Sequence, residues 1–252
     1  MISFSFFIIG SIIGSFLNVC IYRLPLEQDI VLEPSRCPGC KQNISWSSNI
    51  PIVSFLIQKG KCKSCDFKIN WHYPIVEILI GLIFLINFNT HGTSLDFILS
   101  TILFSSLVLI FFTDLKDFLI FDVVTIPISI IGILISLFLI NPFQTNGMSS
   151  VIGSITGYMI IFFIRWVYLK LKNIEGMGLG DAKLFLMIGA WLGVESLLFI
   201  LLFSSLAGSI FGGLMIVFKK NDRFSHIPYG CFIVVATFAY VFFGQWFYNS
   251  IL

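Results

Sequence analysis

Two aspartates beside apolar segments are the residues best suited to chemistry in this sequence. Asp114 ends one long apolar run, and Asp181 begins another, directly after a short run of alternate glycines. The glycines are Gly176, Gly178 and Gly180. Two carboxyl groups a few ångströms apart do not both ionise easily, so one can act as base on a water molecule while the other, still protonated, polarises a carbonyl group. If the fold brings Asp114 and Asp181 together, the pair predicts aspartic protease chemistry.

Each aspartate also has a purely structural interpretation. Asp181 could cap the helix that follows it, and Asp114 could be a solvated loop charge paired with Lys116. For two other aspartates, Asp117 and Asp122, we favour a structural role over a catalytic one. We expect Asp117 to pair with Lys116, and Asp122 to cap the apolar segment that it opens.

The glycines before Asp181 form a second feature with a chemical use. Because glycine takes positive φ at little steric cost, residues 176–180 can approach another chain closely. A helical substrate must unwind before attack, since its carbonyl groups are already hydrogen-bonded. We therefore predict that this loop, together with Lys183, lies beside an extended substrate.

Two Cys-x-x-Cys pairs mark the one sizeable polar segment, residues 25–71. The pairs are separated by 21 residues and consist of Cys37, Cys40, Cys62 and Cys65. Each turn presents two thiolates to one ion, so the spacing indicates a structural, four-cysteine zinc site. Two disulfides are the alternative, but they would need an oxidising compartment. The remaining cysteines, Cys20 and Cys231, lie singly in apolar segments and are predicted to pack there.

Composition indicates which elements position these residues. The 252-residue chain is 57% hydrophobic and 11% charged, with mean hydropathy +0.97, whereas soluble domains carry about 25% charged residues. The sequence predicts an all-α polytopic membrane protein with about eight transmembrane helices and a small cytoplasmic zinc-binding insert. The predicted crossings are 2–21, 72–88, 95–113, 122–140, 149–170, 182–194, 197–218 and 229–249. The first lacks a basic start and a cleavage site, so we expect a retained helix.

The distribution of basic residues predicts the orientation. Three alternate loops, 87–96, 141–149 and 190–196, contain no Lys or Arg. Nearly all basic residues flank the other loops: Arg23, Arg36, Lys41, Lys59, Lys61, Lys63, Lys68, Lys116, Lys170, Lys172, Lys183, Lys219, Lys220 and Arg223. By the positive-inside rule these loops are cytoplasmic and the N-terminus lies outside. Arg165, inside the fifth crossing, is expected to snorkel to the inner surface.

An ordered set of motifs runs along nearly the whole chain. It comprises Gly14-Ser15-Phe16-Leu17-Asn18-Val19-Cys20-Ile21-Tyr22-Arg23-Leu24-Pro25, the paired cysteine turns, Asn49-Ile50-Pro51, Tyr73-Pro74-Ile75-Val76-Glu77, Asp114 with Asp122 and Ile126-Pro127, residues 176–184, and Ile227-Pro228-Tyr229-Gly230. This set resembles the bacterial prepilin peptidases, the type IV leader peptidases of the GxGD intramembrane aspartic protease group. Phe121 and Ser47-Ser48 depart from the family pattern, and the second departure lies in the part associated with methylation.

The resemblance implies a specific activity. Such enzymes cut the basic leader from type IV prepilins or type II secretion pseudopilins at the cytoplasmic face of the bacterial inner membrane, after a glycine. Many then methylate the new N-terminus with S-adenosylmethionine. The implied catalytic pair is Asp114 and Asp181, and the implied zinc ligands are the four paired cysteines. The implied parts are a first transmembrane helix, 1–24, a zinc-binding insert tied to methylation, 25–71, and a peptidase domain, 72–252.

The methyl-donor site must be built from the insert and the helix ends, because the sequence contains no glycine-rich phosphate loop. The candidate contacts are Asn18, Arg23, Asn49 and Glu77, although Glu77 could instead be a satisfied group at the membrane interface. Pilin-type substrates and membrane lipid are the expected partners, and nucleic acid is not.

Two other functions fit parts of the pattern. A GxGD protease with another substrate, such as a preflagellin, would share the two carboxylates, but the paired cysteine turns favour the prepilin branch. A transporter or a zinc-stabilised scaffold could use Asp114 and Asp181 as ion or proton ligands. Replacing each aspartate by asparagine separates an enzyme from a carrier.

Overall fold

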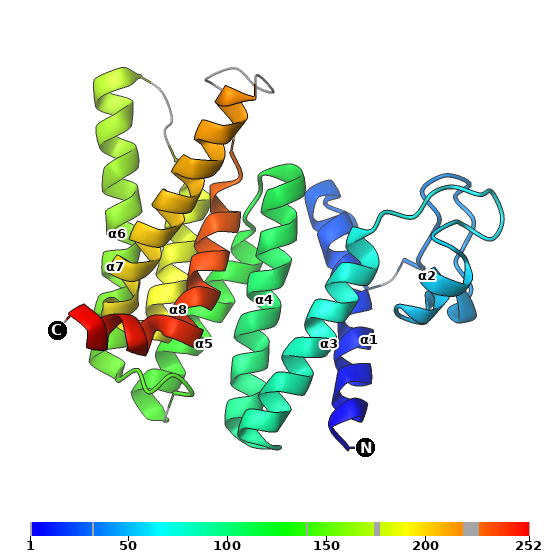
Figure 1. Ribbon diagram of the computed structural model, residues 1–252, viewed down its shortest axis with the longest axis horizontal. Helices are drawn as coiled ribbons and strands as arrows, with labels where there is room; N and C mark the ends of the chain where they lie inside the picture. Colours follow the sequence, from blue (N-terminus) through cyan, green and yellow to red (C-terminus); the bar gives the residue numbers. More distant parts are fainter. Residues whose placement is uncertain (1, 32, 140, 174–176, 219–226, 252) are drawn as a thin grey trace. The chain divides into compact units, whose positions relative to one another are not determined.

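The computed structural model describes residues 2–31, 33–139, 141–173, 177–218 and 227–251. Across these ranges the regular structure is helical, apart from two isolated β-bridges in the insert. The α-helices are α1 (Ile2–Arg23), α2 (Val53–Ile57), α3 (His72–His91), α4 (Leu95–Asp117), α5 (Asp122–Phe138), α6 (Gly147–Lys172), α7 (Leu179–Val217) and α8 (Tyr229–Ile251), with short 3-10 helices η1 (Leu24–Leu26) and η2 (Trp46–Asn49). The all-α prediction is confirmed (Figure 1).

The chain forms two compact units, Met1–Leu109 and Ile110–Leu252, with the boundary inside α4. In the first unit α1 packs along α3, and the polar insert joins them (Figure 1). In the second unit α7 packs against α5, α6 and α8. Both carboxylates singled out by the sequence lie in the second unit, and all four paired cysteines lie in the first.

Glycine determines how closely α1 approaches α3. A methyl group at Gly14 would lie 2.8 Å from the Cα atom of Glu77. Small residues at a helix interface let two backbones come together, as is common where lipid surrounds the helices. One turn further along α1, the amide of Asn18 donates a hydrogen bond of 2.9 Å to the carbonyl of Tyr73. The polar residues of α1 and α3 are therefore buried against each other.

Helix α7 is interrupted at Gly193, where φ is 76° and ψ is 177°. This conformation is essentially restricted to glycine. A methyl group at Gly157 of α6 would lie 2.6 Å from the carbonyl oxygen of Phe185 and 3.3 Å from the side chain of Leu197. In one straight helix those two residues would be about 18 Å apart. The chain therefore reverses at Gly193, and both arms of α7 reach the same point on α6.

The helices predicted from the apolar segments agree with the structure except at their ends. The segments predicted at 182–194 and 197–218 are the two arms of α7. Helix α4 continues four residues beyond its predicted end at residue 113, so Asp114 lies within the last turn of the helix. By length and composition, five described helices can cross a bilayer: Ile2–Leu26, His72–His91, Leu95–Asp117, Gly147–Lys172 and Leu179–Met215. Two shorter apolar helices are Asp122–Phe138 and Tyr229–Gly244.

Candidate active site and metal centre

Asp114 is held at the start of α8. It is only 5% exposed, and its Oδ2 atom accepts a hydrogen bond of 3.0 Å from the backbone N–H of Cys231. Cys231 is the third residue of α8. The first N–H groups of a helix have no partner within that helix and carry partial positive charge. A carboxylate from α4 therefore satisfies the N-terminus of α8, while the Cys231 thiol donates to the carbonyl of Phe111 at 3.3 Å.

Gly230 leaves the space that this carboxylate occupies. A methyl group at Gly230 would lie 2.9 Å from the Oδ2 atom of Asp114 and 2.9 Å from the Cδ1 atom of Ile120. Both separations are well below ordinary van der Waals contact. The glycine of the motif at 227–230 is therefore explained by the close approach of α8 to Asp114.

Asp181 is held by its own loop. It is the third residue of α7 and is 7% exposed. Its Oδ2 atom accepts a hydrogen bond of 3.1 Å from the backbone N–H of Gly178, which directly precedes the helix. This is one half of a capping box, in which an acidic side chain at the third helical position reaches back to the N-cap residue. Asp181 therefore does not occupy the N-cap position of the structural interpretation, because α7 begins two residues earlier, and the contact with Gly178 fixes its carboxylate.

The fold brings the two aspartates together. They lie close enough for the charge of Asp114 to act on Asp181. Ile120 joins their surroundings, because its side chain lies 2.9 Å from the methyl position of both Gly180 and Gly230. Both carboxyl groups are buried, where charges interact more strongly than they do in water.

Lys183 binds Asp122. The Lys183 Nζ atom lies 2.6 Å from Oδ1 and 2.7 Å from Oδ2 of Asp122, so α7 is tied to the first turn of α5. The N-cap residue of α5 is Phe121. The prediction that Asp122 caps this helix is therefore wrong, because its carboxylate turns to the ammonium group of Lys183 instead.

Arg165 anchors the glycine loop from α6. Its Nη1 atom donates a hydrogen bond of 3.1 Å to the carbonyl of Met177, four residues before Asp181. The sequence interpretation of Arg165 as a snorkelling residue missed this contact. The available signal was a charged residue inside an apolar helix, which is costly without a function. Gly176, predicted as part of the same loop, lies outside the described residues.

The paired cysteines form a compact cluster. Their four Sγ atoms all lie within 4.8 Å of one another, and those of Cys37 and Cys65 are 3.8 Å apart. Four sulfur atoms placed tetrahedrally at about 2.3 Å from a zinc ion would be separated by about 3.8 Å. The prediction of a cluster that could hold a metal ion is confirmed. The alternative of two disulfides is wrong, because every one of these thiols is free.

The two cysteine turns share one backbone design. The N–H of Lys41 donates to the carbonyl of Cys37 at 2.9 Å, and the N–H of Asp66 donates to the carbonyl of Cys62 at 3.2 Å. Lys41 and Asp66 both have positive φ, 61° and 55°. Each turn therefore directs its two thiols by local geometry alone, which explains why the spacing was informative.

Comparison with known proteins covers nearly the whole chain. Residues 8–91 match the model of the bacterial peptidase A24 N-terminal domain, and residues 101–213 match that of the type IV leader peptidase family. A prepilin leader peptidase/N-methyltransferase of Aeromonas salmonicida is 32% identical over 98% of this chain and 94% of its own length. This chain belongs to the type IV leader peptidase family.

Other members of the type IV leader peptidase family are similarly related. The protein of the same name from Aeromonas hydrophila is 32% identical over 98% of this chain and 93% of its own. That of Myxococcus xanthus is 35% identical over 84% of this chain and 62% of its own. No solved structure shows a significant match. The family resemblance drawn from the motifs is confirmed.

Arg23 has a structural role in this family member. It is 6% exposed, and its guanidinium group donates to four main-chain carbonyls at 2.7 to 3.5 Å. The acceptors are Asp29, Ile30, Glu33 and Pro34. Arg23 thus fixes the start of the insert. Asn49, another predicted methyl-donor contact, is exposed on η2.

Asn18 and Glu77 lie near each other between α1 and α3. Glu77 is 7% exposed, and its Oε2 atom accepts a hydrogen bond of 2.7 Å from the N–H of Ile52. Asn18 is 2% exposed, and its Oδ1 atom is buried with no hydrogen-bond partner among the described residues. The carbonyl that Asn18 binds belongs to Tyr73, one turn before Glu77. These two of the four predicted contacts are therefore neighbours.

Proposed function

We propose that this protein is a membrane aspartic endopeptidase that removes the leader peptide of type IV prepilins or pseudopilins at the cytoplasmic face of the bacterial inner membrane. Methylation of the new N-terminus by S-adenosylmethionine then follows. The observation that carries this proposal is the placement of Asp114 and Asp181, two buried carboxyl groups from helices far apart in the sequence, around the side chain of Ile120. The family to which the chain belongs supports the same activity.

Asp114 and Asp181 have different roles in hydrolysis, one as the base and the other as the acid. The ionised carboxylate removes a proton from a water molecule, whose oxygen attacks the carbonyl carbon of the peptide bond. The protonated carboxyl group donates a hydrogen bond to the carbonyl oxygen as negative charge develops there. The carbon–nitrogen bond then breaks, and a proton passes to the leaving amine. The hydrogen bonds from Cys231 and Gly178 hold both carboxyl groups in place during these steps.

The proposed membrane arrangement counts the two arms of α7 as separate crossings. Helices α1, α3, α4, α5, α6 and α8 then supply the other six, which gives the eight crossings that the sequence predicts. The basic loops are cytoplasmic by the positive-inside rule, although Lys219, Lys220 and Arg223 lie outside the described residues. We assign cleavage to residues 72–252 and methylation to the first helix, 1–24, with the insert, 25–71.

We propose that the four-cysteine cluster binds Zn²⁺. A sulfur-only, tetrahedral donor set suits this ion and leaves no open coordination position. Its role is structural, because the insert between α1 and α3 is too small to build its own core.

We propose that Asn18 and Glu77 hold the methyl donor. The unpaired Oδ1 atom of Asn18 and the carboxylate of Glu77 are both acceptors, which suits the ammonium group of S-adenosylmethionine. A buried acceptor without a donor costs free energy, so a ligand that supplies one is favoured. When bound, S-adenosylmethionine supplies an electrophilic methyl group. The donors of Arg23 are held by main-chain carbonyls, so we assign that residue no contact with the ligand.

Asparagine substitutions test the catalytic pair. In membranes that contain a prepilin, Asp114→Asn and Asp181→Asn should each abolish cleavage, because an amide is not a base. Asp117→Asn is the matched control, since that carboxylate pairs with Lys116 at 3.4 Å and should be dispensable. Cleavage by either catalytic variant at the wild-type rate would remove the dyad proposal. Mass spectrometry of the product's N-terminus tests methylation separately.

A further inference from the structure

The insert contains an apolar segment whose exposed side chains would be unfavourable in a loop surrounded by water. Residues 50–57 read Ile-Pro-Ile-Val-Ser-Phe-Leu-Ile and include α2. Phe55 is buried and contacts Trp71, with ring centroids 4.8 Å apart. Leu56 and Ile57 instead point outward and are 64% and 76% exposed. A contiguous exposed apolar patch of this kind marks an interaction surface.

This segment is anchored deep along α1 and α3. The N–H of Ile52 donates to the Glu77 carboxylate, and a methyl group at Gly14 of α1 would lie 2.8 Å from the Cα atom of Glu77. Gly14 lies nine residues before Arg23, so it is about 14 Å below the end of α1. The hydrocarbon core of a bilayer is about 30 Å thick. If α1 and α3 span the membrane as proposed, residue 52 therefore lies below the surface of the cytoplasmic leaflet.

The backbone of the segment is suited to that depth. Irregular backbone in a membrane must find its hydrogen-bond partners within the protein. The N–H of Ile52 is taken by Glu77, that of Ser54 by the carbonyl of Ile50 at 3.0 Å, and that of Leu56 by the carbonyl of Ile52 at 3.1 Å. The Ser54 hydroxyl also turns back to the carbonyl of Ile50, at 2.7 Å. These polar groups are satisfied without water.

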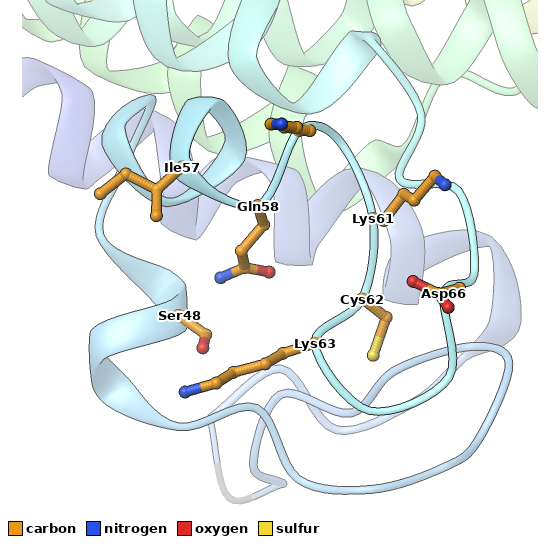
Figure 2. A pocket seen from close by; sticks show the side chains of 8 residues that line it. Ser48, Ile57, Gln58, Lys61, Cys62, Lys63 and Asp66 are labelled. Atoms are coloured by element: carbon orange, nitrogen blue, oxygen red, sulfur yellow. The ribbon is translucent and has the colours of Figure 1, made fainter.

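Lysines follow the apolar residues directly. An open hollow of about 600 Å³ is lined by three lysines and one carboxylate, together with uncharged residues: Lys59, Lys61, Lys63, Asp66, Ser48, Ile57, Gln58 and Cys62. Figure 2 shows Ile57 at one side of this hollow and Lys63 extending across it. Apolar side chains next to a group of lysines match the two layers of an anionic membrane surface, acyl chains below and phosphate groups above.

We propose that residues 50–63 form a lipid-binding element seated in the cytoplasmic leaflet. The side chains of α2 lie among acyl chains, and the three lysines bind the phosphate groups of anionic phospholipids. Charge favours this occupant over the substrate, because three lysines against the one carboxylate of Asp66 leave the hollow positive, and a basic prepilin leader would be repelled. The inference rests on the proposed membrane span of α1 and α3.

Photo-crosslinking tests this element in the full-length protein. Ile57→p-benzoylphenylalanine, in vesicles of phosphatidylcholine and phosphatidylglycerol, should give lipid adducts several-fold above those of the same substitution at Gln42, which is exposed on the first cysteine turn. Ile12, 55% exposed on α1, is the membrane control. Yields at residue 57 no higher than at Gln42, or adducts with an added prepilin in place of lipid, would overturn the proposal.

Two further outcomes separate the parts of the argument. If Ile12 also gives no lipid adducts, the proposed membrane crossing of α1 is refuted, and the lipid-binding element is refuted with it. If Ile12 reacts and Ile57 does not, the membrane placement stands and only this element is refuted. Lys61→Gln with Lys63→Gln should lower the phosphatidylglycerol share of the Ile57 adducts to its share of the bilayer. An unchanged share would refute the lysine contacts.

Discussion

The substitution Gly230→Ala examines the contact that holds Asp114. The added methyl group would lie 2.9 Å from Oδ2 and 3.1 Å from Cγ of Asp114, and 2.9 Å from Cδ1 of Ile120. Ordinary contact begins near 3.4 Å, so the carboxyl group must move by about 0.5 Å. The backbone of Gly230 itself would accept the change, because alanine is the better helix former by up to about 1 kcal/mol.

The expected loss follows from the hydrogen bond that this movement opens. The bond from the N–H of Cys231 to Asp114 is 3.0 Å long. Hydrogen bonds to charged groups contribute about 1.5–3 kcal/mol, which corresponds to a roughly 10- to 150-fold fall in the rate of cleavage. A similar fall is expected when a catalytic group is misplaced by about 1 Å.

Cleavage of a prepilin by purified protein in detergent measures this effect. Gly213→Ala is the matched control, because no atom lies within 4 Å of its methyl position. Circular dichroism should show the same helix content for Gly230→Ala, Gly213→Ala and wild type. Wild-type cleavage by Gly230→Ala would show that the position of Asp114 against α8 does not matter for the reaction, and would refute the argument.

Three further predictions concern the parts around this site. Arg165→Met should lower kcat several-fold with little change in KM, since the substitution releases the carbonyl of Met177. An unchanged kcat would show that Arg165 does not fix the glycine loop for catalysis. Gly193→Ala should lower the free energy of unfolding by about 1–3 kcal/mol, because φ is 76° and the methyl group would lie 2.5 Å from Ser149 Oγ. The midpoint of thermal unfolding should fall, and an unchanged midpoint would contradict this. Cys62→Ser should abolish stoichiometric zinc binding in metal analysis, whereas Cys20→Ser should retain it; equal zinc in both would refute the metal centre.

Several features could be predicted from the sequence because their causes are local. Apolar runs of about 20 residues indicate helices, since in lipid every backbone polar group must be paired within the segment. The Cys-x-x-Cys spacing indicated the cluster because each turn directs its own two thiols. The break between the two arms of α7 was predicted between residues 194 and 197, close to Gly193, because a short loop without Lys or Arg lies there. Asp114 and Asp181 were identified as candidates by their positions beside apolar runs.

The partners of these side chains depend on the tertiary structure. Cys231, which holds Asp114, is 117 residues away in the sequence, and Lys183 lies 61 residues from Asp122. Hydrophobic periodicity shows which face of a helix is buried, but it does not show which helix covers that face. For the same reason Asp122 was assigned to a cap, and the anchoring of residue 52 by Glu77 was not foreseen. The sequence alone determined which groups can react and which segments are helical. The packing of α4, α7 and α8 decided that the two carboxyl groups lie in one buried region around Ile120, because only long-range contacts can bring together side chains from separate helices.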